Sequence, residues 1–278
     1  MSDGDSKSIS LYKELLEITS PDLQVFTKNY PRHPTQFQFN EINEKCVEKI
    51  YGELRKENKI LPRLELVEQI DGLGETCSPC WKFYMTPRNR SAKFLDIKLG
   101  KEFEKHFVTF LNHKGIPSDT IKKGTPLNYP DVEIFNEQKT VIARCEIKYM
   151  SAPFLMLYKK KPGRECYEGS NTLDVGEKIQ KQRKFVETEI NEPVFYVYWL
   201  DYPCVKGVFF MESADVYHYI DSVGGEEFER AERIGDFVKT KDGKKKKLAQ
   251  TKKIYLPLYS MKNFHELMQE LNSLVNVK

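Results

Sequence analysis

The sequence has no long apolar segment, and this absence excludes the simplest membrane architectures. No apolar run approaches the ~20 residues that a helix needs to cross a bilayer. The N-terminal residues 1–7 are polar and acidic and lack the pattern of a secretory signal peptide. We therefore expect a cytoplasmic protein that has no membrane partner.

Cysteine is also scarce, with six residues in a chain of 278. Without a secretory signal, this usage indicates reduced thiols and not a disulfide framework. Cys77 and Cys80 have CxxC spacing, but the sequence contains no second CxxC and no HxxxH motif. A structural zinc would need two further ligands, such as Cys46 or His33. We favour a plain turn at this pair and keep zinc binding as the alternative.

A large excess of one charge sign is missing too, because the formal net charge is only +3. The positive charge is instead concentrated between Lys239 and Lys253, where Asp242 is the one acidic residue. Asp242-Gly243 is a strong turn signal, so we expect a basic β-hairpin at 234–258. A basic ribbon can follow a phosphate backbone, whereas the alternative is a merely solvated hairpin. The candidate nucleic-acid-binding residues are Lys244, Lys245, Lys246 and Lys247.

The most informative feature that is present is an aspartate followed fifteen residues later by Glu-x-Lys: Asp131, Glu146 and Lys148. Residues 141–149 alternate, which predicts a strand with Glu146 and Lys148 together on its polar face. Asp131 lies in a second predicted strand, 129–135. These three residue types can gather a divalent metal and a water molecule against a phosphodiester.

The link between the two predicted strands is short and polar, Glu137 to Thr140. If it is a hairpin loop, the pairing places Asp131 opposite Glu146. Directly opposed residues of a hairpin point to the same face of the sheet. Local geometry alone therefore predicts that Asp131, Glu146 and Lys148 form one cluster. The alternative is that Glu146 and Lys148 belong to a solvated strand face and pair with each other.

A helix predicted to begin near Gly100 adds a third acidic residue. Glu104 shares a helical face with Phe107, Val108 and Leu111, at spacings of three, four and seven residues. A carboxylate at the edge of a core-facing stripe is costly unless a partner compensates its charge. A metal site would supply that compensation.

Together, Pro130-Asp131, Glu146-x-Lys148 and the preceding helix resemble the PD-(D/E)xK nuclease superfamily. That superfamily includes type II restriction enzymes, Mrr-like enzymes and archaeal Holliday-junction resolvases. The resemblance covers residues 96–215. It implies an α/β (α+β) fold with a restriction-endonuclease-like core, in which helices flank a mixed central β-sheet.

The resemblance also implies an activity, a Mg²⁺-dependent DNA endonuclease. Asp131 and Glu146 would hold one or two Mg²⁺ ions, for which Mn²⁺ can substitute, and Glu104 would contribute directly or through water. Lys148 would orient the attacking water and offset charge that develops in the transition state. The accessory candidates are Gln182, with Gln180 and Lys178 as rivals on the same helix, and also Arg144 and Glu133.

Double-stranded DNA is the expected partner, and a homodimer is the expected assembly, because two sites can cut two strands. We favour a restriction or defence enzyme, since the predicted core has substantial additions on both sides. A DNA repair or recombination nuclease is the closest alternative, and an RNA-cleaving relative is another. From a different class, the same fold could serve as a non-catalytic nucleic-acid-binding module.

The additions divide the chain into a mainly helical N-terminal extension that could bind DNA, 1–95, and a nuclease core, 96–278. The extension is either a helical layer packed on the core, which we prefer, or a winged-helix-like module. Its predicted elements are helices at 8–18 (ended by Ser20-Pro21), 41–57 and 64–70 and a strand at 81–85. The remaining predicted elements of the core are a helix at 175–190, buried strands at 193–200 and 205–211, a helix at 213–220 capped by Ser213, and a helix at 261–275.

Overall fold

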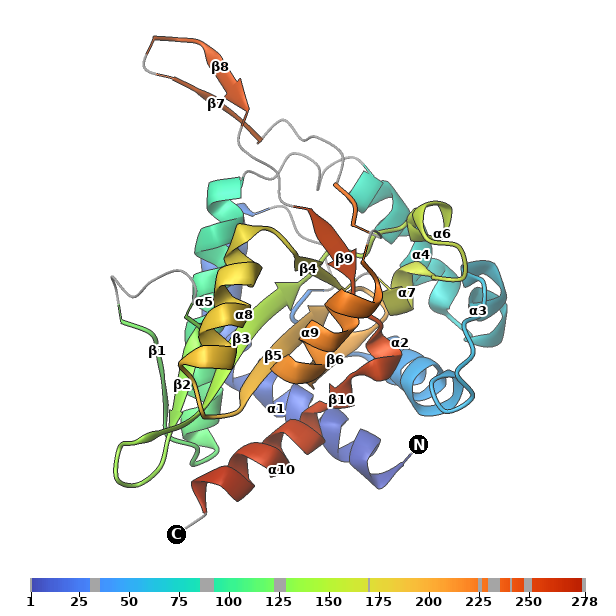
Figure 1. Ribbon diagram of the computed structural model, residues 1–278. Helices are drawn as coiled ribbons and strands as arrows, with labels where there is room; N and C mark the ends of the chain where they lie inside the picture. Colours follow the sequence, from blue (N-terminus) through green and yellow to red (C-terminus); the bar gives the residue numbers. More distant parts are fainter. Residues whose placement is uncertain are drawn as a thin grey trace.

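The computed structural model describes residues 2–30, 36–85, 93–122, 129–169, 171–224, 227–229, 236–240, 242–247 and 252–276. The protein is a mixed α/β protein built on an open six-stranded sheet (Figure 1). One pair of its strands, β3 and β5, is parallel and the other neighbours are antiparallel. In spatial order the strands are β1 (Ser118–Thr120), β2 (Val132–Phe135), β3 (Val141–Met150), β5 (Val194–Asp201), β6 (Lys206–Glu212) and β10 (Lys262–Asn263).

The β2–β3 hairpin has the predicted register. Val132 pairs with Cys145 and Ile134 with Ala143, and a bulge follows at Phe135. Continuing this register by one residue sets Asp131 beside Glu146. The prediction is therefore confirmed, because a short loop and a two-residue side-chain period leave little choice of pairing.

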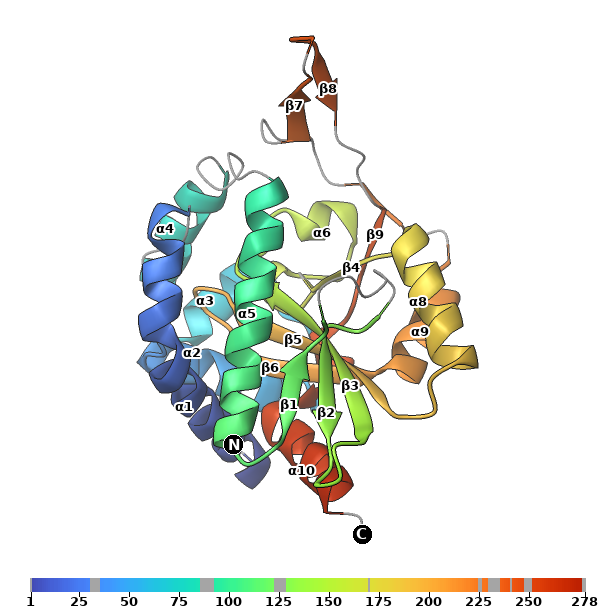
Figure 2. The ribbon, with the colours of Figure 1, turned by 90° about the vertical axis from the view of Figure 1, so that its left-hand side faces the viewer.

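Three helices cover the face of the sheet to which Cys145 and Ile147 point (Figure 2). They are α1 (Asp3–Phe26), α5 (Lys93–His113) and α10 (Phe264–Val275). The predicted end of the first helix was wrong, because α1 continues through Pro21. Proline removes one backbone donor, and the burial of Leu15 and Leu23 on either side holds the helix together.

The opposite face packs against α8 (Glu177–Thr188) and α9 (Ser213–Ser222), as Figure 2 shows. Every residue of β5 is buried, as predicted for a central strand. Ser213 does not cap α9, because Glu212 is the N-cap residue and its side chain forms no capping hydrogen bond. On the first face, the predicted core residues of α10 are buried: Phe264, Leu267, Met268 and Leu271.

The N-terminal extension is helical in its described part. Its elements after α1 are α2 (Glu41–Val47), a π-helical segment (Glu48–Leu54), α3 (Arg63–Gln69) and α4 (Leu73–Met85). The strand predicted at 81–85 was wrong, and so was the turn predicted at Cys77 and Cys80, because both segments belong to α4. Cys80 and Tyr84, one helical turn apart, are buried together against Leu155. A short aromatic run does not distinguish the two-residue period of a strand from the 3.6-residue period of a helix, and tertiary packing selected the helix.

The winged-helix alternative depended on the strand predicted at 81–85, and this segment is helical. Each of the two large core clusters contains residues from both 1–95 and 96–278. The helical layer therefore packs on the sheet, and the exact domain boundary stays a prediction. Among the described helices, none has the length and apolar character that a bilayer crossing requires.

The basic hairpin is shorter than predicted. β7 (Phe237–Lys239) pairs with β8 (Lys245–Lys247) and projects from the body of the protein (Figure 1). β9 (Lys253–Tyr255) pairs instead with β4 (Thr172–Asp174), because Ile254 and Leu173 are buried in the core. Other parts of the predicted hairpin, at 234–235, 241 and 248–251, lie outside the described residues. The segment between β3 and β4 adds two unpredicted short helices, α6 (Leu157–Lys160) and α7 (Cys166–Gly169).

Candidate active site

The hairpin brings Asp131, Glu146 and Lys148 together at one end of the sheet. Asp131 Oδ2 accepts a hydrogen bond from the backbone N–H of Ile147 at 2.9 Å. The ammonium group of Lys148 forms an ion pair and a hydrogen bond with Glu146 Oε1. The predicted three-residue cluster is thus present, and backbone pairing holds two of its members in place.

Glu146 is the centre of the cluster, with only 1% of its side chain exposed. Besides Lys148, it accepts a hydrogen bond from Lys178 Nζ at 3.0 Å and one from Gln182 Nε2 at 2.8 Å. Burial alone raises the pKa of the Glu146 carboxyl. The positive charges of Lys148 and Lys178 and the hydrogen bonds outweigh burial and lower this pKa to about 2.

Gln182 is held from both sides by neighbours in the core. Its amide N–H₂ donates to Glu146, and its Oε1 accepts from the hydroxyl of Tyr196 at 2.7 Å. The Tyr196 hydroxyl lies 3.3 Å from that of Tyr217 on α9. Of the rivals on α8, Lys178 also reaches Glu146, whereas Gln180 is exposed. Gln182 therefore fixes the orientation of the Glu146 carboxylate.

The pKa of the Asp131 carboxyl is shifted in the direction opposite to that of Glu146. Burial is the largest cause that raises its pKa, and the charge of Glu146 and then that of Glu104 add to it. Lys148 and Lys178 act in the other direction, and the pKa of Asp131 is nevertheless raised to about 7. A carboxyl that is buried beside other carboxylates favours its neutral form until a cation arrives.

Glu104 lies on α5 with 14% of its side chain exposed, and its nearest described cation is Lys101, at 4.0 Å. Burial raises the pKa of Glu104, and the charge of Glu146 contributes to the rise. Yet within the described ranges no three His, Cys, Asp or Glu side chains converge so that they could hold a metal ion. The connection of Glu104 to the cluster is thus electrostatic in this arrangement, and its direct contribution to a metal site stays a prediction.

The donor set fits magnesium in chemistry and in number. Mg²⁺ usually binds through one or two carboxylates and takes its other ligands from water and substrate phosphates. Asp131 and Glu146 supply two hard oxygen donors, and at Asp131 burial and the neighbouring carboxylates outweigh the charges of Lys148 and Lys178 and raise the pKa. Lys178, whose side chain is 49% exposed, shares Glu146 Oε1 with Lys148, so its departure would free one acceptor position on that oxygen.

The other two accessory candidates are engaged with each other. Glu133 and Arg144 are directly paired across β2 and β3, and their side chains form an ion pair. Arg144 also lies 3.9 Å from Glu192 and has its guanidinium group 5.7 Å from the centre of the Tyr129 ring. These contacts assign Arg144 and Glu133 a role in holding the hairpin, and no hydrogen bond or ion pair found among the described residues joins either of them to Glu146.

The four candidate lysines of the β7–β8 hairpin, Lys244 to Lys247, are all exposed. Lys244 Nζ lies 3.4 Å from a carboxylate oxygen of Asp242, and Lys245 Nζ lies 4.5 Å from the centre of the Phe237 ring. The structure therefore separates these lysines from the acidic cluster and places them on the projecting hairpin.

Two buried polar features escaped the sequence reasoning. Tyr198 of β5 is paired in register with Lys148, and its fully buried hydroxyl has no hydrogen-bond partner among the described residues. Asp201 and Lys206 form a fully buried ion pair, which the Tyr149 hydroxyl joins. The available signal for the second feature was one charged residue at each of the adjoining ends of two apolar strands, Asp201 at the end of β5 and Lys206 at the start of β6. Nothing local signalled the first, because it depends on which strand lies next to β3.

Comparison with known proteins adds no assignment to this geometry. No family model matches the chain, and a search of the curated proteins found no match.

Proposed function

We propose that this protein is a Mg²⁺-dependent DNA endonuclease of the PD-(D/E)xK type, with a restriction-endonuclease-like core. The observation that carries the proposal is the meeting of Asp131, Glu146 and Lys148 on one hairpin, with Gln182 behind Glu146. A purely structural hairpin gains little from burying a carboxylate whose pKa rises to about 7. Sites at which pKa values of neighbouring acids diverge are typical of catalysis.

Each residue has a distinct task in this proposal. Asp131 and Glu146 would hold the metal, and Gln182 keeps the Glu146 carboxylate oriented. Bound Mg²⁺ would polarise the phosphate, acidify the attacking water and stabilise the leaving oxygen. Lys148 would hold that water by a hydrogen bond and offset negative charge on the phosphate. Lys178, released from Glu146, would remain as a nearby positive charge.

Double-stranded DNA is the substrate that we propose, cut by a homodimer in a restriction or defence role. The exposed lysines of the β7–β8 hairpin support a polyanionic partner, since phosphate contacts dominate affinity for nucleic acids. One observation favours the non-catalytic alternative, a nucleic-acid-binding module. No third acidic group joins Asp131 and Glu146 among the described residues, so the site depends on the substrate to complete the metal shell.

Plasmid nicking separates these two functions. The protein is incubated with supercoiled plasmid in Mg²⁺ or in EDTA, and the wild type is compared with Lys148→Ala and Asp131→Ala. Gln180→Ala, at an exposed position of the same α8 helix, is the control. We expect Mg²⁺-dependent cutting that both cluster variants abolish and the control retains. Near-normal cutting by either cluster variant would refute the site, and DNA binding without cutting by the wild type would favour the module.

A further inference from the structure

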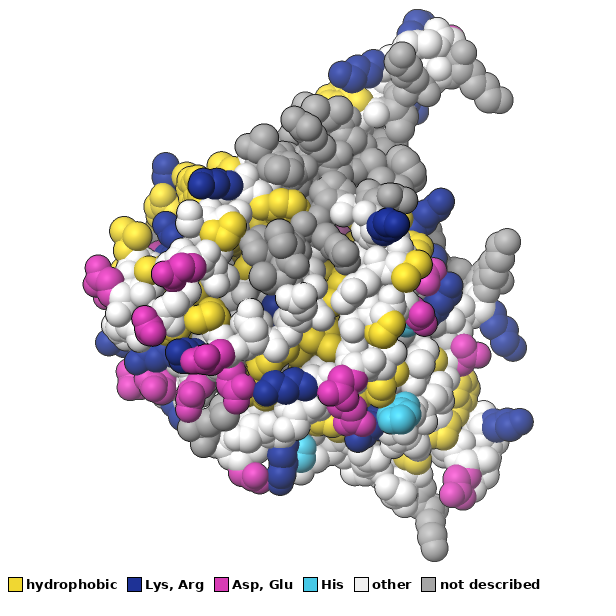
Figure 3. Space-filling model, turned by 180° about the vertical axis from the view of Figure 1, so that it is seen from behind, with side chains coloured by type: hydrophobic (Ala, Val, Ile, Leu, Met, Phe, Trp, Pro, Cys, Tyr) yellow, Lys and Arg dark blue, Asp and Glu magenta, His cyan; other side chains and the backbone are white. Residues whose placement is uncertain are grey.

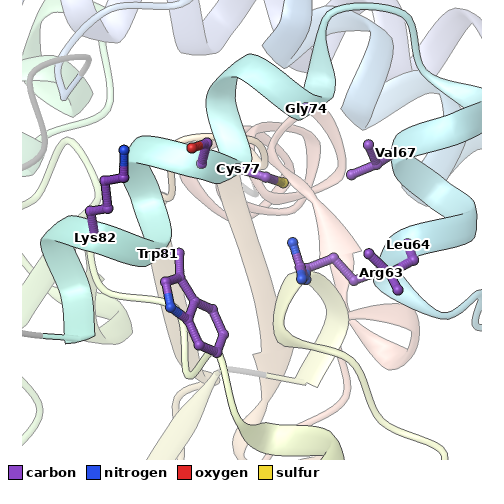
Figure 4. A pocket seen from close by; sticks show the side chains of 8 residues that line it. Arg63, Leu64, Val67, Gly74, Cys77, Trp81 and Lys82 are labelled. Carbon is purple, nitrogen blue, oxygen red and sulfur yellow. The ribbon is translucent and has the colours of Figure 1, made fainter.

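A second candidate site lies in the N-terminal extension, between α3 and α4 (Figure 4). It is a pocket of about 280 Å³. Ligand pockets usually measure ~300–1,000 Å³, so this one suits a small planar group and not a large cofactor. Its wall contains Arg63, Leu64 and Val67 from α3 and Gly74, Cys77, Ser78, Trp81 and Lys82 from α4.

The pocket exposes apolar surface that the fold does not use. Trp81 is 39% exposed and Leu64 is 67% exposed, which makes them two of the few large hydrophobic residues that face solvent. Figure 3 shows hydrophobic side chains at the surface with Lys and Arg side chains beside them. Exposed apolar surface often marks a binding site when it forms a patch, and an aromatic ring attracts a cation that lies over its face.

Arg63 lies beside the indole ring, and Lys82 is a second basic residue of the pocket wall. The guanidinium carbon of Arg63 lies 6.0 Å from the centre of the Trp81 ring. Burial raises the pKa of the Cys77 thiol, and the nearby Arg63 acts in the opposite direction. Among the ion pairs of the described residues, none includes Arg63 or Lys82. Glu165 is an acidic group near Arg63. Burial raises the pKa of the Glu165 carboxyl, and the charge of Arg63 acts in the opposite direction. The pocket thus offers positive charge for an anionic ligand.

We propose that this pocket binds one unpaired nucleotide of a DNA strand. The base would stack on the indole ring of Trp81, and its phosphate would contact Arg63 and Lys82. Stacking on an exposed aromatic ring beside cations is how proteins hold unpaired bases, because every base has a π-face and every nucleotide a phosphate. The identity of the ligand as DNA rests on the proposed function, whereas the pocket's preference for an aromatic anion does not.

The opposite face of α4 connects the pocket to the candidate active site. Cys80 and Tyr84 are buried there against Leu155, and the Tyr84 hydroxyl donates a hydrogen bond to the carbonyl of Ser151. Ser151 follows Lys148 by three residues, a span of about 10 Å in extended chain. Helix α4 therefore links the wall of the pocket to the chain segment that follows the candidate active site.

Tryptophan fluorescence tests the proposal directly, because the chain has two tryptophans and Trp199 is fully buried. The full-length Lys148→Ala variant is titrated without Mg²⁺, so that cleavage does not interfere. The probes are a 12-nucleotide single strand of thymidines, a blunt duplex, the same duplex with one bulged base, and dTMP. We expect the single strand and the bulged duplex to quench the emission, and dTMP to quench it only at much higher concentration. The blunt duplex should leave the emission unchanged.

Binding of a labelled single strand, followed by anisotropy, identifies the residues. Trp81→Ala should weaken it by about 5- to 150-fold, the usual worth of one stacked base. Arg63→Gln and Lys82→Gln should weaken both binding and quenching, and Lys56→Gln, at an exposed position outside the pocket, should change neither. Absence of quenching by the single strand, or quenching that survives both charge substitutions, would overturn the proposal.

An acidic peptide that contains phenylalanine distinguishes a protein partner. If this peptide quenches Trp81 and the single strand does not, the pocket binds protein and the proposal is wrong. The plasmid assay remains independent of these measurements. Quenching without any cutting would refute the nuclease function and support nucleotide binding at the pocket. Cutting without quenching would support the nuclease function and refute nucleotide binding at the pocket.

Discussion

Asp131→Asn should stabilise the metal-free protein at neutral and alkaline pH. The pKa of Asp131 in the folded state is raised to about 7, from an ordinary value of 3.8. A raised pKa contributes stability that is fully present below pH 3.8 and is lost as pH rises through 7. Asparagine is neutral throughout this window. Its side-chain oxygen can still accept the hydrogen bond from the Ile147 N–H, so the substitution removes the charge and keeps the shape.

The size of the effect follows from the shift of the pKa. A change of about 3 units corresponds to about 4 kcal/mol of unfolding free energy once Asp131 is fully ionised. Side chains relax around a buried charge and water reaches it, so we expect about 2–4 kcal/mol at pH 8. For a chain of this size the gain corresponds to a rise in Tm of roughly 5–10 °C. At pH 5 the two proteins should differ by less than half of this amount.

Thermal and urea unfolding of both proteins, in EDTA between pH 5 and 8.5, measures the effect. The reasoning would be refuted by equal stability at pH 8, or by a difference that does not grow with pH. Addition of Mg²⁺ supplies a second comparison at pH 8. It should stabilise the wild type more than the variant, because the variant lacks one of the two carboxylate ligands and a ligand stabilises only the state that binds it. Equal stabilisation would mean that Asp131 does not hold the metal.

Three further outcomes are expected. Tyr198→Phe should raise the unfolding free energy by about 1–2 kcal/mol, because it removes a buried hydroxyl without a partner; a loss of stability in urea unfolding would mean that a bound water or Lys148 satisfies this hydroxyl. Gln182→Ala should lower the kcat of plasmid cutting more than it weakens DNA binding, since Gln182 orients Glu146 and is itself buried; an unchanged kcat would contradict this role. Substitution of the four hairpin lysines by glutamine should weaken binding to every DNA sequence. The slope of log K against log salt should fall by roughly 0.9 for each lysine that neutralises a phosphate. An unchanged slope would mean that the β7–β8 hairpin is merely solvated.

Local patterns in the sequence are sufficient to predict the β2–β3 hairpin and therefore the position of Asp131 beside Glu146. A two-residue alternation and a short polar loop fix the register without help from the rest of the chain. The same local logic predicted the fully buried β5 and the apolar face of α10. These features depend on side-chain periods and turn chemistry, which act over a few residues.

The surroundings of Glu146 depend on contacts between segments that are far apart in the sequence. The parallel pairing of β5 with β3 brings Tyr196 and Tyr198 beside the cluster, and the packing of α8 presents Gln182 and Lys178 to it. Long-range packing also made 81–85 helical and paired β9 with β4 instead of with the basic hairpin. In each case the local pattern was compatible with more than one structure. The burial of apolar surface against distant segments then selected one, because that term sums over contacts that no short window of sequence contains.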